Sequence, residues 1–252
     1  MSGVGVGVGS TLAALQLRAG GSPFFGGHAT LADGLVSYWA LDEESGTRYD
    51  SVGSNDLQDN NTVGFATVTG PPNFPGGKAA SFVHANQEYL SHVDDPSLRV
   101  GVADFTLAFW YKRTADTALT LVLSKGGQND YTFDTNPFSQ TGMRLYCING
   151  GAYPTANWGS ALTLNQWYLI IGWRDGAAQV LRLQVNDAAY AEVATGTIVS
   201  GDTNGALSIG GVAANSGTHS MGHVGFWSRV LTAQERTDLF NAGKGLFYGD
   251  TP

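Results

Sequence analysis

The chain has 252 residues, of which 42% are hydrophobic and only 13% are charged, well below the ~25% charged residues usual for soluble domains. Its 35 glycines indicate short strands joined by tight turns rather than long helices. The net charge of −8 and the lack of any run of Lys or Arg exclude nucleic-acid binding and disfavour attachment to an anionic membrane. No apolar run approaches the ~18 residues of a transmembrane helix, so we expect no membrane insertion.

The first segment, residues 1–30, is a glycine-rich N-terminal arm. Gly and Val alternate over residues 2–9, and one short apolar patch follows at residues 11–18. Composition alone favours a tail, but such an arm can also order against its own domain or against another subunit. No basic region precedes the apolar stretch, so we expect no signal peptide and synthesis in a cytoplasm without export.

From residue 31 onward, short runs of strand-forming residues are bounded by Gly, Asn and Asp. We expect strands at residues 35–41, 105–111, 120–124, 143–148, 167–173, 180–185, 206–210 and 224–227. This spacing predicts an antiparallel sandwich or barrel, so residues 31–252 are expected to form one β-sandwich domain. The single cysteine, Cys147, lies in one of these runs and is expected to be a buried core residue rather than a catalytic thiol.

One short helix is expected near the C-terminus. Thr232 and Glu235 have the spacing of a capping box, in which each residue's side chain binds the backbone N–H of the other. Leu239 and Phe240 give the helix an apolar face. Gly243 is placed to end it in a left-handed conformation.

Four stretches in this order carry a family pattern. They are LVSYWALDEESGT at residues 35–47 with DSVG at 50–53 and Asn55; GKAASF at 77–82 with QEYL at 87–90; DFTLAFWYK at 104–112 with LNQWY at 164–168; and VGFWSRVLT at 224–232. Together they resemble the laminin-G-like, concanavalin-A-like jelly-roll domains. The resemblance implies an all-β, antiparallel two-sheet jelly-roll sandwich with one short C-terminal helix behind the extended arm. This fold hosts lectins, receptor modules, adhesins, enzyme-attached modules and virion proteins, so it does not fix a function.

We expect no catalytic residues. Glycosidases need two carboxylates that face one sugar, often from an alternating Glu-x-Asp-x-x-Glu strand, and the sequence has no such strand. The acidic cluster at residues 42–44 lies at an expected turn. No Gly-x-Ser-x-Gly, His-Glu-x-x-His or phosphate-loop motif is present. The chain is therefore expected to be a binding or structural module rather than an enzyme.

The resemblance also implies a structural calcium ion near the Asp-Ser-x-Gly loop, with Asp50 and Asn55 on one side of the site. The other side departs from the family pattern, because Gly222 and His223 stand where the family has an Asp-Glu pair. This difference removes anionic ligands. Two interpretations of the loop therefore remain, a calcium site or an Asx turn made by Asp50.

The segment 153–158 is the expected carbohydrate site. It combines the aromatic residues Tyr153 and Trp158 with the amide of Asn157 in an expected loop. A sugar stacks its apolar face on an aromatic ring and hydrogen bonds through its hydroxyls, so this combination suits a glycan. In the competing interpretation, Trp158 covers one end of the core.

The N-terminal arm is the part of the chain that departs most from the family pattern. We therefore expect the arm to carry the function that is specific to this protein. A low-charge arm that orders against a neighbour locks a subunit into an assembly. We therefore expect a non-enzymatic virion structural or decoration protein of a bacteriophage, on the capsid or on a tail appendage, made in the host cytoplasm. Its expected partners are other virion subunits bound through residues 1–27, a surface glycan, and further copies of itself. The alternative is a secreted carbohydrate-binding adhesin or lectin.

Overall fold

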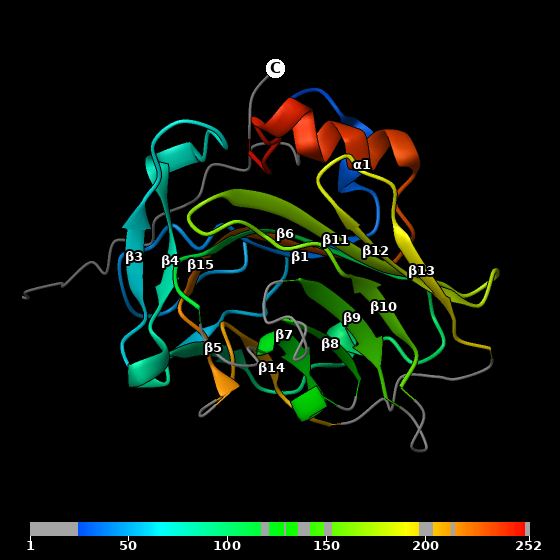
Figure 1. Ribbon diagram of the computed structural model, residues 1–252, viewed down its shortest axis with the longest axis horizontal. Coiled ribbons are helices and arrows are strands. Elements are labelled where there is room, and N and C mark those ends of the chain that lie inside the picture. The colour runs from blue at the N-terminus through cyan, green and yellow to red at the C-terminus, as the bar shows by residue number, and fades with distance from the viewer. Residues whose placement is uncertain are drawn as a thin grey trace, which may run out of the picture.

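The computed structural model describes residues 25–116, 121–128, 130–135, 142–148, 153–196, 204–212 and 215–249. These segments form two antiparallel β-sheets packed face to face, with one α-helix on the outer side of one sheet (Figure 1). The predicted jelly-roll sandwich with one short C-terminal helix is therefore confirmed. Residues 1–24 of the predicted arm lie outside the described residues.

Sheet I has the strand order β13-β12-β11-β6-β15-β4-β3, and β1 also pairs with β15. Its strands are β1 (Leu35–Trp39), β3 (Gly64–Thr67), β4 (Lys78–Phe82), β6 (Phe105–Arg113), β11 (Trp167–Asp175), β12 (Val180–Val185), β13 (Ala191–Ala194) and β15 (His219–Trp227). Strand β15 changes partner along its length, because its first half pairs with β4 and its second half pairs with β1. A β-bulge between Gly222 and Gly225 separates the two halves.

Sheet II has the strand order β10-β9-β8-β7-β14-β5-β2. Its strands are β2 (Gln58–Asn60), β5 (Tyr89–His92), β7 (Leu121–Lys125), β8 (Tyr131–Thr135), β9 (Met143–Cys147), β10 (Thr155–Trp158) and β14 (Leu207–Ile209). Short 3-10 helices are placed at η1 (Ala29–Ala32), η2 (Pro75–Gly77), η3 (His84–Asn86), η4 (Pro96–Leu98), η5 (Gly126–Gln128) and η7 (Asn241–Gly243). No helix in these ranges is long and apolar enough to cross a membrane.

The main hydrophobic core fills the space between the two sheets. Gly172 of β11 allows a close approach there, since a Cβ atom at this position would lie 2.5 Å from Cζ of Phe133 and 2.6 Å from Cδ2 of Leu145. Cys147 is buried in this core, as predicted, and burial raises the pKa of its thiol to about 12. The thiol is therefore protonated at neutral pH and serves as packing.

A second core lies on the outer face of sheet I, where α1 (Ala233–Phe240) covers the tryptophans of β6 and β11. The predicted capping box is present: Thr232 Oγ1 accepts from the N–H of Glu235, and the Glu235 carboxylate accepts from the N–H of Thr232. The helix ends at Phe240, and the left-handed backbone begins at Asn241 and includes Gly243, so it starts two residues earlier than predicted. Phe240 then stacks on Trp110 with ring centroids 6.2 Å apart.

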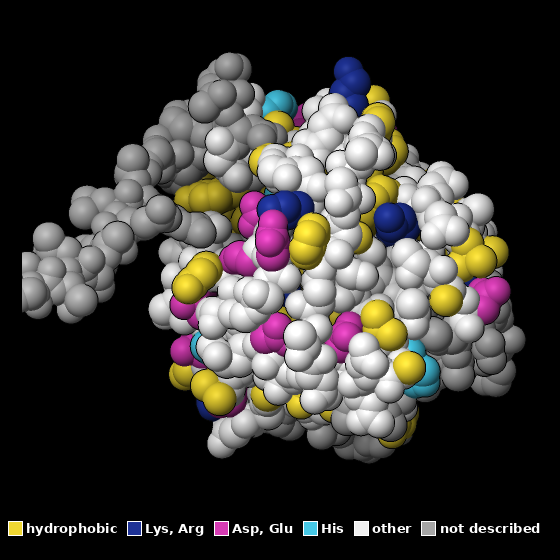
Figure 2. All heavy atoms as spheres, turned by 90° about the vertical axis from the view of Figure 1, so that its left-hand side faces the viewer, with side chains coloured by type: hydrophobic (Ala, Val, Ile, Leu, Met, Phe, Trp, Pro, Cys, Tyr) yellow, Lys and Arg dark blue, Asp and Glu magenta, His cyan; other side chains and the backbone are white. Residues whose placement is uncertain are grey.

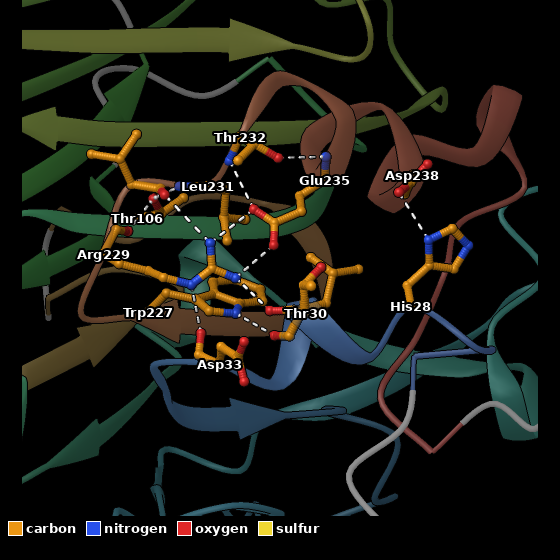
Figure 3. Close-up of polar contacts among 12 residues, drawn as sticks. His28, Thr30, Asp33, Thr106, Trp227, Arg229, Leu231, Thr232, Glu235 and Asp238 are labelled. Carbon is orange, nitrogen blue, oxygen red and sulfur yellow. Dashed lines mark hydrogen bonds and ion pairs between the residues drawn. The ribbon is translucent and has the colours of Figure 1, made fainter.

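The segment before β1 is fixed to the helical side of sheet I. Phe25 is fully buried between Tyr38 and Tyr248. Arg229 binds both carboxylate oxygens of Glu235 at 2.7 and 2.8 Å (Figure 3). The same guanidinium donates to the carbonyl oxygens of Thr30 and Asp33 (Figure 3). One arginine thus joins η1, the end of β15 and the start of α1.

Candidate functional site

Asp50, the predicted metal ligand, organises the loop that follows β1. One carboxylate oxygen accepts from the N–H groups of Tyr38 and Val52, both at 3.0 Å, and the other accepts from the N–H of Asn55 at 3.1 Å. The bond from Val52, two residues further along the chain, is that of an Asx turn. The carboxylate of Asp50 is therefore held by three backbone N–H groups.

Asn55, the second predicted ligand, is buried beneath the same loop. Its Nδ2 donates to Ser37 Oγ at 2.8 Å and to Ser97 Oγ at 3.0 Å, while its Oδ1 is buried without a hydrogen bond inside the described ranges. A calcium ion takes about six or more oxygen ligands, several of them carboxylates. No group of three or more His, Cys, Asp or Glu side chains in these ranges is arranged to hold a metal ion. The residues gathered here do not fit a calcium site.

His223, which replaces an acidic residue of the family pattern, is a buried side chain at the bulge of β15. Its backbone φ of 54° is left-handed. Its Nδ1 is 2.9 Å from the hydroxyl of Tyr38, and its ring packs against Phe74 and Phe247. Burial lowers the pKa of His223 to about 3, so the ring is neutral at pH 7. It acts as a packed polar group on the outer face of sheet I.

The predicted carbohydrate segment forms an edge strand instead of the expected loop. Thr155–Trp158 is β10, which pairs with β9 and has its other edge unpaired in sheet II. Tyr153 lies just before the strand and has 61% of its surface exposed. Asn157 is also exposed, whereas Trp158 is half-buried and packs against the core between the sheets. Because neighbouring side chains of a strand point to opposite faces, Asn157 and Trp158 do not share a surface.

Asn157 belongs to the outer face of sheet II, which is lined by polar side chains. One row of register partners crosses all the strands of the sheet: Thr155, Tyr146, Thr132, Ser124, Ser208, Ser91 and Gln58. Every member of this row bears a hydroxyl or an amide. The alternate residues of the same strands, such as Leu145 and Phe133, point into the core. Four members of the row, Tyr146, Thr132, Ser124 and Ser208, are buried, so its solvent-accessible part lies at the two ends.

A second row next to it contains Asn157, Arg144 and Asp134 on β10, β9 and β8. Arg144 binds Asp134 through two nitrogens, with Nε 2.7 Å from Oδ1. The side chain of Asp134 is buried, whereas that of Arg144 retains 19% exposure beside Asn157. Burial raises the pKa of Asp134, and the hydrogen bonds and positive charge of Arg144 oppose the shift. The carboxylate therefore acts as a fixed anchor for the guanidinium.

Arg144 and Asp134 were not among the residues predicted from the sequence. The signal was available, since Thr132 and Asp134 alternate with apolar Tyr131 and Phe133, and Arg144 alternates in the same way on the next strand. A charged residue on each of two paired strands predicts a cross-strand ion pair. The strand Tyr131–Thr135 was not predicted, so the pair could not be placed.

The charged side chains of one face of the sandwich are mostly isolated from one another (Figure 2). The side of the sandwich that carries β3 and β4 shows acidic side chains scattered among uncharged ones, and its basic side chains stand apart from one another (Figure 2). A surface that follows phosphates carries a basic stripe. This face instead carries scattered acidic side chains and isolated basic ones (Figure 2).

The family profile described as the concanavalin A-like lectin/glucanases superfamily matches residues 84–235. Among solved structures, the binding domain of Paraclostridial Mosquitocidal Protein 1 is similar with a TM-score of 0.62 and 14% identity, over 83% of this chain and 52% of that one. The binding domain of botulinum neurotoxin DC in complex with rat synaptotagmin II gives 0.61 and 10%, over 83% and 52%. The chain thus spans about half the length of these toxin domains.

A further structure covers a single domain of matching size. Domain 4 of AbnA, an extracellular arabinanase from Geobacillus stearothermophilus in complex with arabinotriose, has a TM-score of 0.57 and 14% identity, over 81% of this chain and 97% of that one. No curated protein matches the sequence. At these identities, the structural comparisons establish the shared fold.

Proposed function

Because the chain belongs to the concanavalin A-like lectin/glucanases superfamily, we propose that it is a non-catalytic glycan-binding domain that binds sugar at the β9–β10 end of sheet II. One observation carries the proposal: Arg144 and Asn157 are register partners on the outer face, and the exposed Tyr153 lies two residues before Thr155, where the same edge strand begins.

These three side chains supply the chemistry that a sugar requires. The ring of Tyr153 offers an apolar face for stacking, and the Asn157 amide and the Arg144 guanidinium offer hydrogen bonds to hydroxyls. Asp134 holds Arg144 through two bonds, so little side-chain entropy is lost on binding. The arabinotriose complex of the Geobacillus domain supports a glycan as ligand for this fold.

The carboxylate content of the two polar rows supports the proposal that the domain is not an enzyme. A glycosidase needs two carboxyl groups separated by about 5–10 Å, with one of them free to donate a proton. The two polar rows described above contain one carboxylate, Asp134, and it is held by Arg144. Binding is the function that these rows support.

Substitution at the exposed tyrosine tests this function. Tyr153→Ala and Asn157→Ala should each weaken binding to the oligosaccharides identified on a glycan array by about tenfold, with an unchanged melting temperature. Tyr49→Ala is the matched control, because Tyr49 is 51% exposed on a different loop. Equal binding by all three variants and the original chain would rule out this surface.

The wider role follows from the arm. We infer that the domain is displayed on a bacteriophage virion, on the capsid or a tail appendage, with residues 1–24 bound to neighbouring subunits. The alternating Gly and Val residues of the arm and its low charge support this role. The burial of Phe25 supports it too, because the arm then starts from a fixed point on sheet I. The alternative remains a secreted carbohydrate-binding adhesin.

Truncation separates the two roles. Removal of residues 1–24 should abolish incorporation into virus particles and leave glycan binding intact, as measured by sedimentation with particles and by the array. The cut has to precede Phe25, because a cut after residue 27 would also remove a buried ring from the second core. Full incorporation of the truncated chain would contradict the virion role.

A further inference from the structure

A cavity of about 530 Å³ lies on the outer face of sheet I, on the opposite side of the sandwich from Arg144 and Asn157. We call it the Trp167 cavity. Its floor includes Trp110 and Lys112 of β6 and Trp167 of β11, and its walls include residues of the β3–β4 loop and Phe240 at the end of α1. Its volume falls within the ~300–1,000 Å³ of small-molecule sites.

The cavity has an aromatic and amide lining. Trp167 is held in place by Phe74, with ring centroids 5.0 Å apart, and Phe240 stacks on Trp110. Asn165, Gln166 and Asn186 supply amides along the rim. The Oδ1 of Asn186 accepts from the N–H of Leu169 at 2.9 Å, so its NH₂ group is the part left to bind a ligand. Flat rings beside amide donors suit the two kinds of surface on a sugar.

Lys112 is the charged residue of the lining. Its Nζ lies over the ring of Trp167, 4.9 Å from the centroid. The side chain is half-buried, and burial lowers the pKa of its ammonium group. Its register partners Trp167 and Ser220 are uncharged, and it makes no ion pair with any residue that the structure describes. A partly desolvated cation without a carboxylate partner is most stable when a ligand supplies the anion.

Lys78 provides a comparison within the same protein, because it combines a cation–π contact with an ion pair. Its Nζ lies 5.5 Å from the centroid of the Phe65 ring, in a comparable cation–π contact. Unlike Lys112, it also binds Glu44 at 2.7 Å. Two lysines thus lie over aromatic rings on sheet I, and the one in the cavity lacks the carboxylate.

We propose that the Trp167 cavity binds an acidic sugar, with the ring of the sugar against Trp167, its carboxylate at Lys112, and its hydroxyls at the amides of Gln166 and Asn186. The site is separate from the β9–β10 surface and does not depend on it. The domain then carries two sugar sites on opposite outer faces, one of which selects for negative charge.

A pair of ligands that differ only by the carboxylate tests the selection. Methyl β-glucuronide should shift the assigned indole N–H signal of Trp167 in a ¹H–¹⁵N spectrum at about millimolar concentration. Methyl β-glucoside should bind at least about tenfold more weakly. Equal binding of the two, or no shift with the glucuronide at about 50 mM, would overturn the proposal. Acetate or phosphate that binds as well as the glucuronide would show a simple anion site, and would overturn the sugar part.

Matched variants locate the effect. Lys112→Met keeps the aliphatic stem on Trp167 and removes the charge, so glucuronide affinity should fall to that of the glucoside. Lys78→Met, the control, should leave the affinity for the glucuronide unchanged. Retained glucuronide selectivity in Lys112→Met, with a melting temperature like that of the original chain, would contradict the assignment.

Discussion

The hydroxyl of Tyr38 and Nδ1 of His223, 185 residues apart in the sequence, lie 2.9 Å apart in a buried hydrogen bond. Tyr38 belongs to β1, and His223 occupies the bulge at which β15 exchanges β4 for β1. The same hydroxyl accepts from the N–H of Tyr248 at 3.3 Å. One phenol therefore joins the first strand, the last strand and the C-terminal segment.

The buried histidines predict loss of stability in acid. His219 stacks on Phe82, and neither of its ring nitrogens has a hydrogen-bond partner within the described chain. Burial lowers its pKa to about 3, whereas an unfolded histidine titrates near 6.5. The unfolded state therefore binds more protons between these values, so stability falls as pH drops from about 6.5 toward 3.

His219→Phe replaces the imidazole with a ring that cannot titrate. It also removes the two ring nitrogens that lack hydrogen-bond partners within the described chain. We expect the variant to be at least as stable as the original chain at pH 7 and to gain a growing advantage as the pH falls from 6.5. Urea denaturation at several pH values between 7.5 and 4 measures the difference. Parallel pH profiles for the two proteins would show that His219 is not a source of acid sensitivity.

Glu235 predicts a loss of stability at lower pH. Burial raises its pKa, but hydrogen bonds from Arg229 and the Thr232 N–H outweigh that effect and hold it at about 2. Because the pKa in the folded state is below the ordinary glutamate value of 4.5, the carboxylate stabilises the fold above pH 4.5, and this contribution is lost as pH falls toward 2. Glu235→Gln should therefore be destabilised at pH 7 by an amount that shrinks below pH 4.5. A constant difference across this range would contradict the ion pair with Arg229.

Phe25→Ala should destabilise the domain by about 3–5 kcal/mol, because a fully buried ring between Tyr38 and Tyr248 leaves a cavity when truncated. Deletion of residues 1–24, which leaves the ring in place, provides the comparison. Chemical denaturation monitored by tryptophan fluorescence measures both proteins. A change below about 1 kcal/mol for Phe25→Ala would show that the segment before β1 is not part of the fold.

Gly172→Ala tests the close approach of the sheets. The added methyl group would meet the Phe133 ring and Leu145, so we expect a loss of about 1–3 kcal/mol. Gly159→Ala is the matched control, since a Cβ there meets nothing within 4 Å. The control should stay within about 0.5 kcal/mol of the original chain. Equal stability of the two variants would mean that the sheets can separate at Gly172 without cost.

The central strands and the capping box were predictable because their signals are local. Strand β6 is a continuous run of β-formers, buried on both faces, and so is most of β11. Thr232 and Glu235 lie within one helical turn. Strands β2, β3 and β13 were missed, since each is short, lies at a sheet edge and contains few β-formers. Their pairing is set by tertiary contacts.

The surfaces were less predictable because they depend on register. The contact of Arg144 with Asp134 follows from the pairing of β9 with β8, which could not be placed because strand β8 was not predicted. The Trp167 cavity draws on residues from Thr67 to Gly243, so the sequence holds no contiguous motif for it. Asn157 was identified from the residue types of segment 153–158. The β-strand that turns Asn157 and Trp158 to opposite faces was not predicted.

The contact of Phe25 with Tyr248, with ring centroids 5.7 Å apart, has a mechanical consequence. A force applied between the two ends of the described chain would first load this aromatic contact and the neighbouring hydrogen bonds of Arg229, before it reached the ladder between β1 and β15. The end segments can then peel away while the two sheets stay together. A domain attached through both ends would keep sheet II, the face proposed to bind sugar, intact under tension.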